Sequence, residues 1–292
     1  MMKQVFLVIL LAFGFVVGAQ NKIVKKPKKQ KPATTQVAPK KHKSQSKPTK
    51  GGTVKCVATK ASYSNGTLTV NGIKYNMVWV DGGTFRMGAT SEQGSEISDE
   101  KPVHSVTLSG YYIGKTEVTQ ALWQAVMGSN PSYFEGDDLP VEQVSWDDCQ
   151  EFIRKLNSLT GQNFRLPTEA EWEFACRGGN NSRGYKYSGS NYIDNVAWYD
   201  GNSGDKTHPV ATKSPNELGI YDMSGNVWEW CADWYGDYSS GRQTNPKGPY
   251  DGSRRVGRGG SWFIGARGCR SSDRYFDHPT VRYLNLGLRL AL

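Results

Sequence analysis

Residues 180–292 lack a regular hydrophobic period, and this limits the possible folds more than any other feature of the chain. The stretch is rich in Gly, Asn, Ser, Trp and Tyr, and its strand-like runs are short. So long an irregular segment usually counts against a compact domain. However, five of the nine tryptophans lie in it, and each brings a large apolar area that favours burial. We therefore predict an irregular but packed segment within a turn-rich globular domain.

The first 19 residues match the three-part pattern of a secretory signal peptide. Lys3 precedes a continuous apolar run of 13 residues from Val5 to Val17, and the small residues Gly18 and Ala19 offer a cleavage point. The run is too short to span a bilayer, so we predict a signal peptide at 1–19 rather than an uncleaved anchor. We expect an exported protein, either periplasmic or secreted and surface-associated, with no transmembrane helix in the mature chain.

The net charge of +9 belongs to a segment that we do not expect to fold. Residues 21–50 contain eleven lysines and no acidic residue, mixed with Pro, Gln, Ser and Thr. Such a composition buries too little apolar surface, so we predict a disordered Lys/Pro-rich linker at 20–52. A solvated spacer is favoured over an electrostatic tether. From residue 51 onward 27 acidic residues face 24 basic ones, so the charge gives no reason to expect a nucleic-acid groove on the domain.

Turn and cap signals mark the regular elements. Asn65-Gly66 and Asn71-Gly72 are hairpin turn signals, so we predict an N-terminal β-hairpin extension at 53–76. Further strands are expected at 73–80, 84–88 and 106–113. Three helices are predicted, each from an N-cap residue to a terminating glycine: from Thr119 to Gly128, from Ser145 to Gly161, and from Thr168 to Gly178.

Common enzyme and metal motifs are missing from the sequence. The five cysteines are widely spaced, and their odd number leaves at least one unpaired or joined between chains: Cys56, Cys149, Cys176, Cys231 and Cys269. No CxxC pair or Cys/His cluster supports a structural zinc site. The sequence also lacks HExxH, GxSxG and Walker motifs, which disfavours the corresponding protease, hydrolase and nucleotide-binding classes.

Seven short strings, in order and at matching spacing, resemble the formylglycine-generating-enzyme or sulfatase-modifying-factor family over about residues 77–292. They lie at 82–88, 115–119, 140–146, 165–173, 225–230, 258–262 and 287–289. The resemblance implies a single α+β domain of the formylglycine-generating-enzyme fold, which is C-type-lectin-like and has little regular secondary structure. This implication agrees with the irregular second half of the chain.

The resemblance also implies bound calcium. One calcium loop matches Asp222, Met223, Gly225 and Val227, and part of a second matches Asn195 and Val196, with Asp205 as a guess for its carboxylate. A carboxylate with backbone carbonyls is a donor set that calcium accepts. The alternative is that Asp222 and Asn226 are turn residues that hold no ion.

Active members of the family oxidise a cysteine of a sulfatase peptide to formylglycine, using oxygen and a copper(I) ion held by two cysteines. In this sequence the first of those positions is Ile264. Cys269 is the candidate for the second, although a rival alignment with a short deletion makes it a different residue. Copper(I) selects soft thiolate ligands, and Ile264 has none, so copper and the oxidase activity are not expected. We then expect Cys269 to be structural, with two disulfide partners left open: Cys231, and Cys176, whose family counterpart is disulfide-linked near this region.

Further site residues are also carried over from the family. Trp228, Ser261, Trp262, Ile264 and Arg274 match its substrate cleft. Arg274 and Arg289 fit either a substrate carboxylate or buried structural pairs. Asp233 and Asp237 form an acid pair that we expect to be solvated on an exposed loop after Trp234.

Two functions remain open. The first is a non-oxidising binding or scaffold domain that holds a peptide, a glycan or a partner protein, such as an exported sulfatase or an envelope assembly. The alternative is an active maturase for exported sulfatases, against which Ile264 counts.

Overall fold

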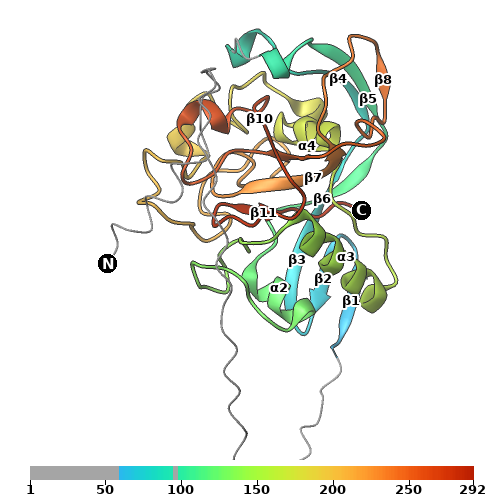
Figure 1. The fold of residues 1–292 in the computed structure, drawn as a ribbon, viewed down its shortest axis with the longest axis vertical. Helices are drawn as coiled ribbons and strands as arrows, with labels where there is room; N and C mark the ends of the chain where they lie inside the picture. The colour runs from blue at the N-terminus through green and yellow to red at the C-terminus, as the bar shows by residue number, and fades with distance from the viewer. Residues whose placement is uncertain (1–58, 95–97) are drawn as a thin grey trace, which may run out of the picture. The chain divides into compact units, whose positions relative to one another are not determined.

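The computed structural model describes residues 59–94 and 98–292 (Figure 1). The predicted signal peptide at 1–19, the predicted linker at 20–52, the first residues of the predicted extension and Cys56 lie outside these ranges. Within them, no helix is both long enough and apolar enough to cross a membrane.

The first sheet confirms the two hairpin turns. It has the order β1-β2-β3-β6 and is antiparallel, with strands β1 (Ala61–Ser64), β2 (Thr67–Val70), β3 (Ile73–Val80) and β6 (Tyr111–Gly114). Asn65 and Gly66 have φ values of 49° and 75°, and Asn71 and Gly72 have 49° and 88°. Positive φ at both residues is what a tight two-residue hairpin needs. Because β3 also pairs with β6, the hairpin is part of the domain's own sheet.

Two further sheets join distant parts of the chain. One has the order β4-β5-β8, with β4 (Gly83–Met87), β5 (His104–Leu108) and β8 (Gln243–Thr244). The other has the order β10-β9-β7-β11, with β10 (Arg274–Asp277), β9 (Arg255–Arg258), β7 (Trp228–Trp234) and β11 (Leu286–Leu288). In it β11 lies parallel to β7, so the end of the chain joins the Trp-rich strand.

The three helices begin and end where the cap signals place them. They are α2 (Gln120–Met127), α3 (Trp146–Thr160) and α4 (Glu169–Cys176). Thr119 caps α2, and the other two begin with reciprocal capping boxes, Ser145 with Asp148 and Thr168 with Glu171. Left-handed glycines end α2 and α3, whereas Arg177 ends α4 before Gly178.

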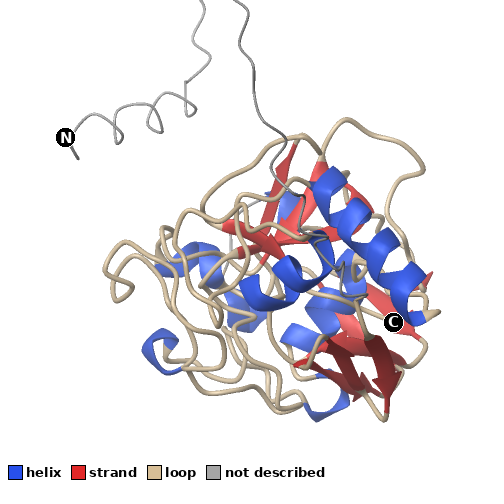
Figure 2. Cartoon of the chain, turned by 90° about the horizontal axis from the view of Figure 1, so that it is seen from below, coloured by secondary structure: helices blue, strands red, loops and turns tan. Residues whose placement is uncertain are grey.

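The irregular second half is packed, as the tryptophans predicted. Loops make up much of the described chain, as Figure 2 shows. Yet Val196, Ile220, Met223 and Trp262 are at most 5% exposed, and Trp230 is fully buried. One core cluster joins β1–β3, α2 and α3 to Trp228 and Trp230, and a second joins β4–β6 and α4 to Cys231. The protein is an α+β domain with little regular secondary structure.

Candidate functional site

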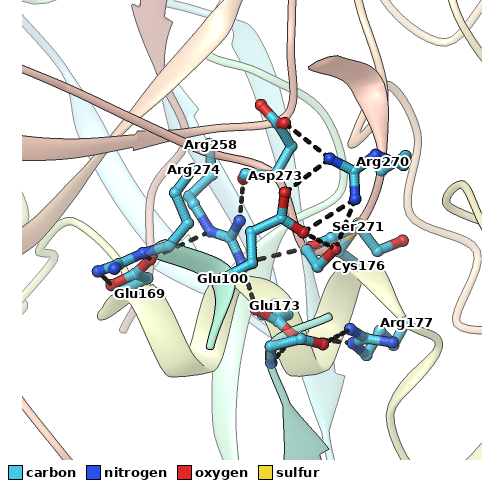
Figure 3. Close-up of polar contacts among 12 residues, drawn as sticks. Glu100, Glu169, Glu173, Cys176, Arg177, Arg258, Arg270, Ser271, Asp273 and Arg274 are labelled. Atoms are coloured by element: carbon cyan, nitrogen blue, oxygen red, sulfur yellow. Dashed lines mark hydrogen bonds and ion pairs between the residues drawn. The ribbon is translucent and has the colours of Figure 1, made fainter. Parts of the chain in front are cut away.

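Several arginine and glutamate side chains pair with one another in the interior (Figure 3). Arg274 donates from Nε and Nη2 to both carboxylate oxygens of Glu169, at 2.6 and 2.8 Å. Arg270 forms the same kind of bidentate pair with Glu100, at 2.9 and 2.6 Å, and Arg258 pairs with Glu173. A buried charge is costly unless it is paired, so each of these residues needs its partner in the folded protein.

Arg274 does not line a cleft, which corrects our prediction. Its neighbour Tyr275 stacks on Trp228, with ring centroids 5.1 Å apart. Successive strand residues point to opposite faces of a sheet, so Arg274 faces away from Trp228. Its guanidinium group is already bound by Glu169.

Arg289 is likewise structural. Directly after β11 it donates from Nε and Nη2 to Glu229 on β7, with the shortest distance, 2.6 Å, from Nη2. The indole Nε1 of Trp172 donates to the same carboxylate at 2.6 Å. Both charged side chains are fully buried. This pair joins the 225–230 and 287–289 strings into one structural unit.

Asp233 was expected on an exposed loop, and that expectation was wrong. It lies in β7, is 4% exposed, and accepts the backbone N–H of Glu169 at 2.9 Å. Burial, and next the charge of Glu169, raise the pKa of Asp233 to about 8. Asp237, by contrast, is exposed.

The structure brings three of the predicted cleft residues together. The backbone of Asn285 accepts the N–H of Trp228 at 2.8 Å, while its side chain donates to Ser261 Oγ at 3.1 Å. Trp262 donates from Nε1 to the carbonyl of the preceding residue, Leu284, at 3.1 Å. Segment 284–285 therefore fixes Trp228, Ser261 and Trp262 side by side.

Ile264 follows this group directly. Its N–H donates to the carbonyl of Ser261 at 3.1 Å, and its side chain packs, partly buried, against the core cluster that contains Trp228. A branched hydrocarbon thus lies beside the cleft residues. A surface hollow of about 560 Å³ lies elsewhere, along α3, and none of the predicted cleft residues lines it.

The four described cysteines are free and buried in the structure, so neither of the pairings expected for Cys269 is present in it. Cys269 packs with Tyr187 and Val196, apart from the cluster of Trp228 and Ile264. Burial, and next the charge of Asp273, raise the pKa of the Cys269 thiol well above its usual value. Without a metal, it is therefore a neutral thiol at neutral pH.

Two buried carboxyl groups lie close together at the first predicted calcium loop, one within the loop and one from the 115–119 segment. Asp222 is 4% exposed, and its Oδ2 accepts the N–H of Ala211 at 2.7 Å. Glu117 is fully buried and accepts from Asn226 Nδ2 at 2.7 Å and from the N–H of Val227 at 3.1 Å. Burial raises the pKa of both carboxyls, that of Asp222 to about 6, and the charge of Asp222 further raises that of Glu117. Glu117 was missed as a site residue, although it lies within the 115–119 string.

The donor chemistry of this loop fits calcium. The ion prefers oxygen ligands, including carboxylates and carbonyls, and its charge would offset the repulsion between the two buried carboxyls. Gly225 has a φ of 84°, and a Cβ on it would lie 2.3 Å from the carbonyl oxygen of Trp198, so the loop needs glycine there. No group of three or more His, Cys, Asp or Glu side chains that could hold a metal occurs in 59–94 or 98–292, so an ion here would depend on carbonyls.

The second predicted loop fits less well. Asn195 is exposed and its carbonyl accepts the N–H of Ser214, while Val196 is buried. The ammonium of Lys213 already lies 2.7 Å from the carbonyl oxygen of the adjacent Asp194. Asp205, the guessed carboxylate, is exposed on the following turn.

Sequence reasoning also missed a loop beside Trp262. Tyr133 and Phe134 extend from it, and the ring centroid of Phe134 lies 5.6 Å from that of Trp262. The only sequence signal was two consecutive aromatic residues between Pro131 and Gly136, a composition that does not reveal which surface they join.

Comparisons with known proteins agree with this fold and these motifs. A family model described as "Sulfatase-modifying factor enzyme 1-like domain" matches residues 68–292. The chain is 37% identical over 252 residues to "Chaperone protein LppX" of Paenibacillus barcinonensis, covering 69% of this chain and 82% of that protein. It is 30% identical over 285 residues to the formylglycine-generating enzyme of Mus musculus, covering 74% of each.

A solved structure, "Treponema denticola variable protein 1", superposes with a TM-score of 0.70 at 38% identity, covering 77% of this chain and 97% of that one. The fold and motifs thus define a domain of the formylglycine-generating-enzyme type. The chain belongs to the sulfatase-modifying-factor family.

Proposed function

We propose that this chain is an exported binding module that holds a protein or peptide partner and does not carry out copper-dependent cysteine oxidation. The observation that carries the proposal is the pair of residues at the expected copper positions. The Ile264 side chain offers no ligand atom, so Cys269, which is fully buried, is the one remaining sulfur at these two positions. Copper(I) sites in proteins rely on soft, deprotonated sulfur ligands, which this arrangement does not supply.

Similarity to a relative that is named as a chaperone protein supports a protein-binding role. Export is proposed from the signal pattern at 1–19. To test export, the full chain is expressed, and the cytoplasmic, periplasmic and medium fractions are separated. The N-terminus of the exported protein is then sequenced, and we expect it at Gln20. An uncleaved chain in the cytoplasmic fraction would contradict export.

The oxidase question is tested by titrating copper(I) into the reduced protein without oxygen and then adding oxygen with a cysteine-containing sulfatase peptide. We expect no stoichiometric copper binding and no formylglycine, while the mouse relative named as the formylglycine-generating enzyme serves as the positive control. Stoichiometric copper together with peptide oxidation would establish the active maturase instead.

We also propose that the first loop binds calcium through Asp222 and backbone carbonyls of Met223, Gly225 and Val227. A bound divalent cation would supply positive charge beside Asp222 and Glu117 and so stabilise the native state. We expect chelation to lower the melting temperature of the wild type but not of Asp222→Asn. Equal melting curves with calcium and with chelator would refute this site.

A further inference from the structure

Four aromatic rings from two loops form a continuous row, which we name the aromatic ladder: Tyr133, Phe134, Trp262 and Phe263. Successive ring centroids are 5.0, 5.6 and 5.3 Å apart, and each contact is edge-to-face. Such geometry is favourable between aromatic rings. The ladder therefore behaves as one surface although its residues are far apart in the chain.

The two ends of the ladder are open to solvent. Tyr133 is 63% exposed and Phe263 is 42% exposed, whereas Trp262 between them is only 5% exposed. Exposed aromatics next to a buried one are typical of the anchor positions of protein interfaces, where Tyr, Trp and Phe are enriched.

Buried polar side chains hold the ladder in place. Glu142 Oε1 accepts the backbone N–H groups of Tyr133 and Phe134, the latter at 2.8 Å. Gln120 donates from Nε2 to the carbonyl of Phe134 at 2.6 Å and accepts the N–H of Gly136 at 3.0 Å. A surface fixed before binding loses less conformational entropy on association, so the rings are already arranged for a partner.

The charge around Tyr133 and Phe134 is negative. Glu135, Asp137 and Asp138 follow in the same loop, all three are exposed, and none takes part in an ion pair with another described residue. Beneath the loop, Glu142 Oε2 is buried and has no hydrogen-bond partner. No positively charged residue in this loop balances these carboxylates, so a cation at the surface would be attracted to them.

We infer that the aromatic ladder and the acidic residues beside it form the docking surface for a basic segment of a partner protein. Lysine and arginine side chains bind to ring faces by cation–π attraction and to carboxylates by charge. A neutral glycan would use the rings but not the carboxylates, so charge complementarity favours the basic peptide. This inference rests on the proposed binding function and specifies the kind of partner that is bound. Trp262 links the two surfaces, because it belongs both to the cleft and to the ladder.

The test is a selection of short random peptides, displayed on phage and lacking cysteine, against the full chain. Leaving out cysteine prevents capture of a substrate thiol, so the result stays readable even if the copper experiment reveals an oxidase. We expect enrichment of peptides with lysine or arginine next to apolar residues. For the most enriched peptide, Tyr133→Ala with Phe263→Ala should weaken binding about tenfold or more.

Matched variants separate the ladder from general surface effects. Tyr192→Ala removes a ring that is 77% exposed but outside the ladder, and it should leave the affinity unchanged. Asp137→Asn with Asp138→Asn should weaken binding several-fold at low salt and much less at high salt, whereas the exposed Asp251→Asn should do neither. All variants should keep the wild-type melting temperature.

Three results would overturn the inference. They are enrichment of acidic or uncharged peptides, equal loss of binding in Tyr192→Ala and the ladder variant, and binding to a glycan array that is lost in the ladder variant.

Discussion

Removing one charge from the Glu229–Arg289 pair should destabilise the domain strongly. Glu229→Gln keeps the side-chain volume but leaves Arg289 without its ionised partner. The guanidinium then retains the carbonyls of Gly114 and Tyr221, each at 2.9 Å, and one neutral amide oxygen in place of the carboxylate. Breaking a buried pair in this way costs about 3–5 kcal/mol, because the remaining charge stays in a low-dielectric interior.

The structure favours the lower end of that range. The two backbone carbonyls still accept from the guanidinium, so it keeps some compensation. A loss of about 3 kcal/mol is still a large part of the ~5–15 kcal/mol that stabilises a typical domain. For a domain of this size it should lower the melting temperature by about 6–12 °C, measured by circular dichroism at neutral pH.

Two controls make the measurement decisive. Glu151→Gln breaks a pair with Arg154 on α3 whose side chains are 36% and 70% exposed, and it should cost no more than about 0.5 kcal/mol. Replacing both Glu229 and Arg289 with methionine should be less harmful than Glu229→Gln, because no charge is left buried. A shift for Glu229→Gln no larger than that for Glu151→Gln would refute the argument.

Three more outcomes follow from burial and backbone geometry. The pKa of Asp233 is raised to about 8 in the folded protein, against ~4 in an unfolded chain, so the folded state holds a proton that the unfolded state releases. The stabilising effect of that proton is lost as pH rises from about 4 to 8, and Asp233→Asn should remove this part of the slope in urea titrations at several pH values. Burial raises the thiol pKa of Cys149, Cys231 and Cys269, so iodoacetamide should label these cysteines only in urea. Labelling is measured by mass spectrometry, and a labelled Cys269 in the native protein would contradict the structure. Gly225→Ala should lower the free energy of unfolding by about 1–3 kcal/mol more than Gly204→Ala. Both glycines have positive φ, but only at Gly225 would a Cβ meet a backbone oxygen. Equal losses in chemical denaturation would argue against the tight contact with Trp198.

Local structure could be predicted wherever residues that are close in the chain satisfy each other's hydrogen bonds or share a turn conformation. Thr119, Ser145 and Thr168 start helices because their hydroxyls accept N–H groups within the same turn. The Asn-Gly pairs form hairpins because Asn and Gly tolerate positive φ. The family was also identified from short strings, since their order and spacing are properties of the sequence alone.

The candidate site could be predicted only in part. The sequence identified Trp228, Ser261 and Trp262, which the structure does hold together through Asn285 and its neighbour. It misplaced Arg274, because the choice of sheet face depends on the register of β10 against β9. It also misjudged Asp233, because β7 extends to Trp234 and buries a carboxylate that composition alone would leave in solvent.

The sequence by itself determined the helix ends, the hairpin turns and the missing sulfur at Ile264, because each depends on residues that are close in the chain. It also determined the family, because the order and spacing of the strings do not depend on folding. Only the tertiary structure decided which charges neutralise one another and which aromatic rings meet. Arg274 with Glu169, Arg289 with Glu229, and Phe134 with Trp262 are contacts between residues 60 or more positions apart. No local pattern encodes such partners, since they come together only when the sheets and loops pack.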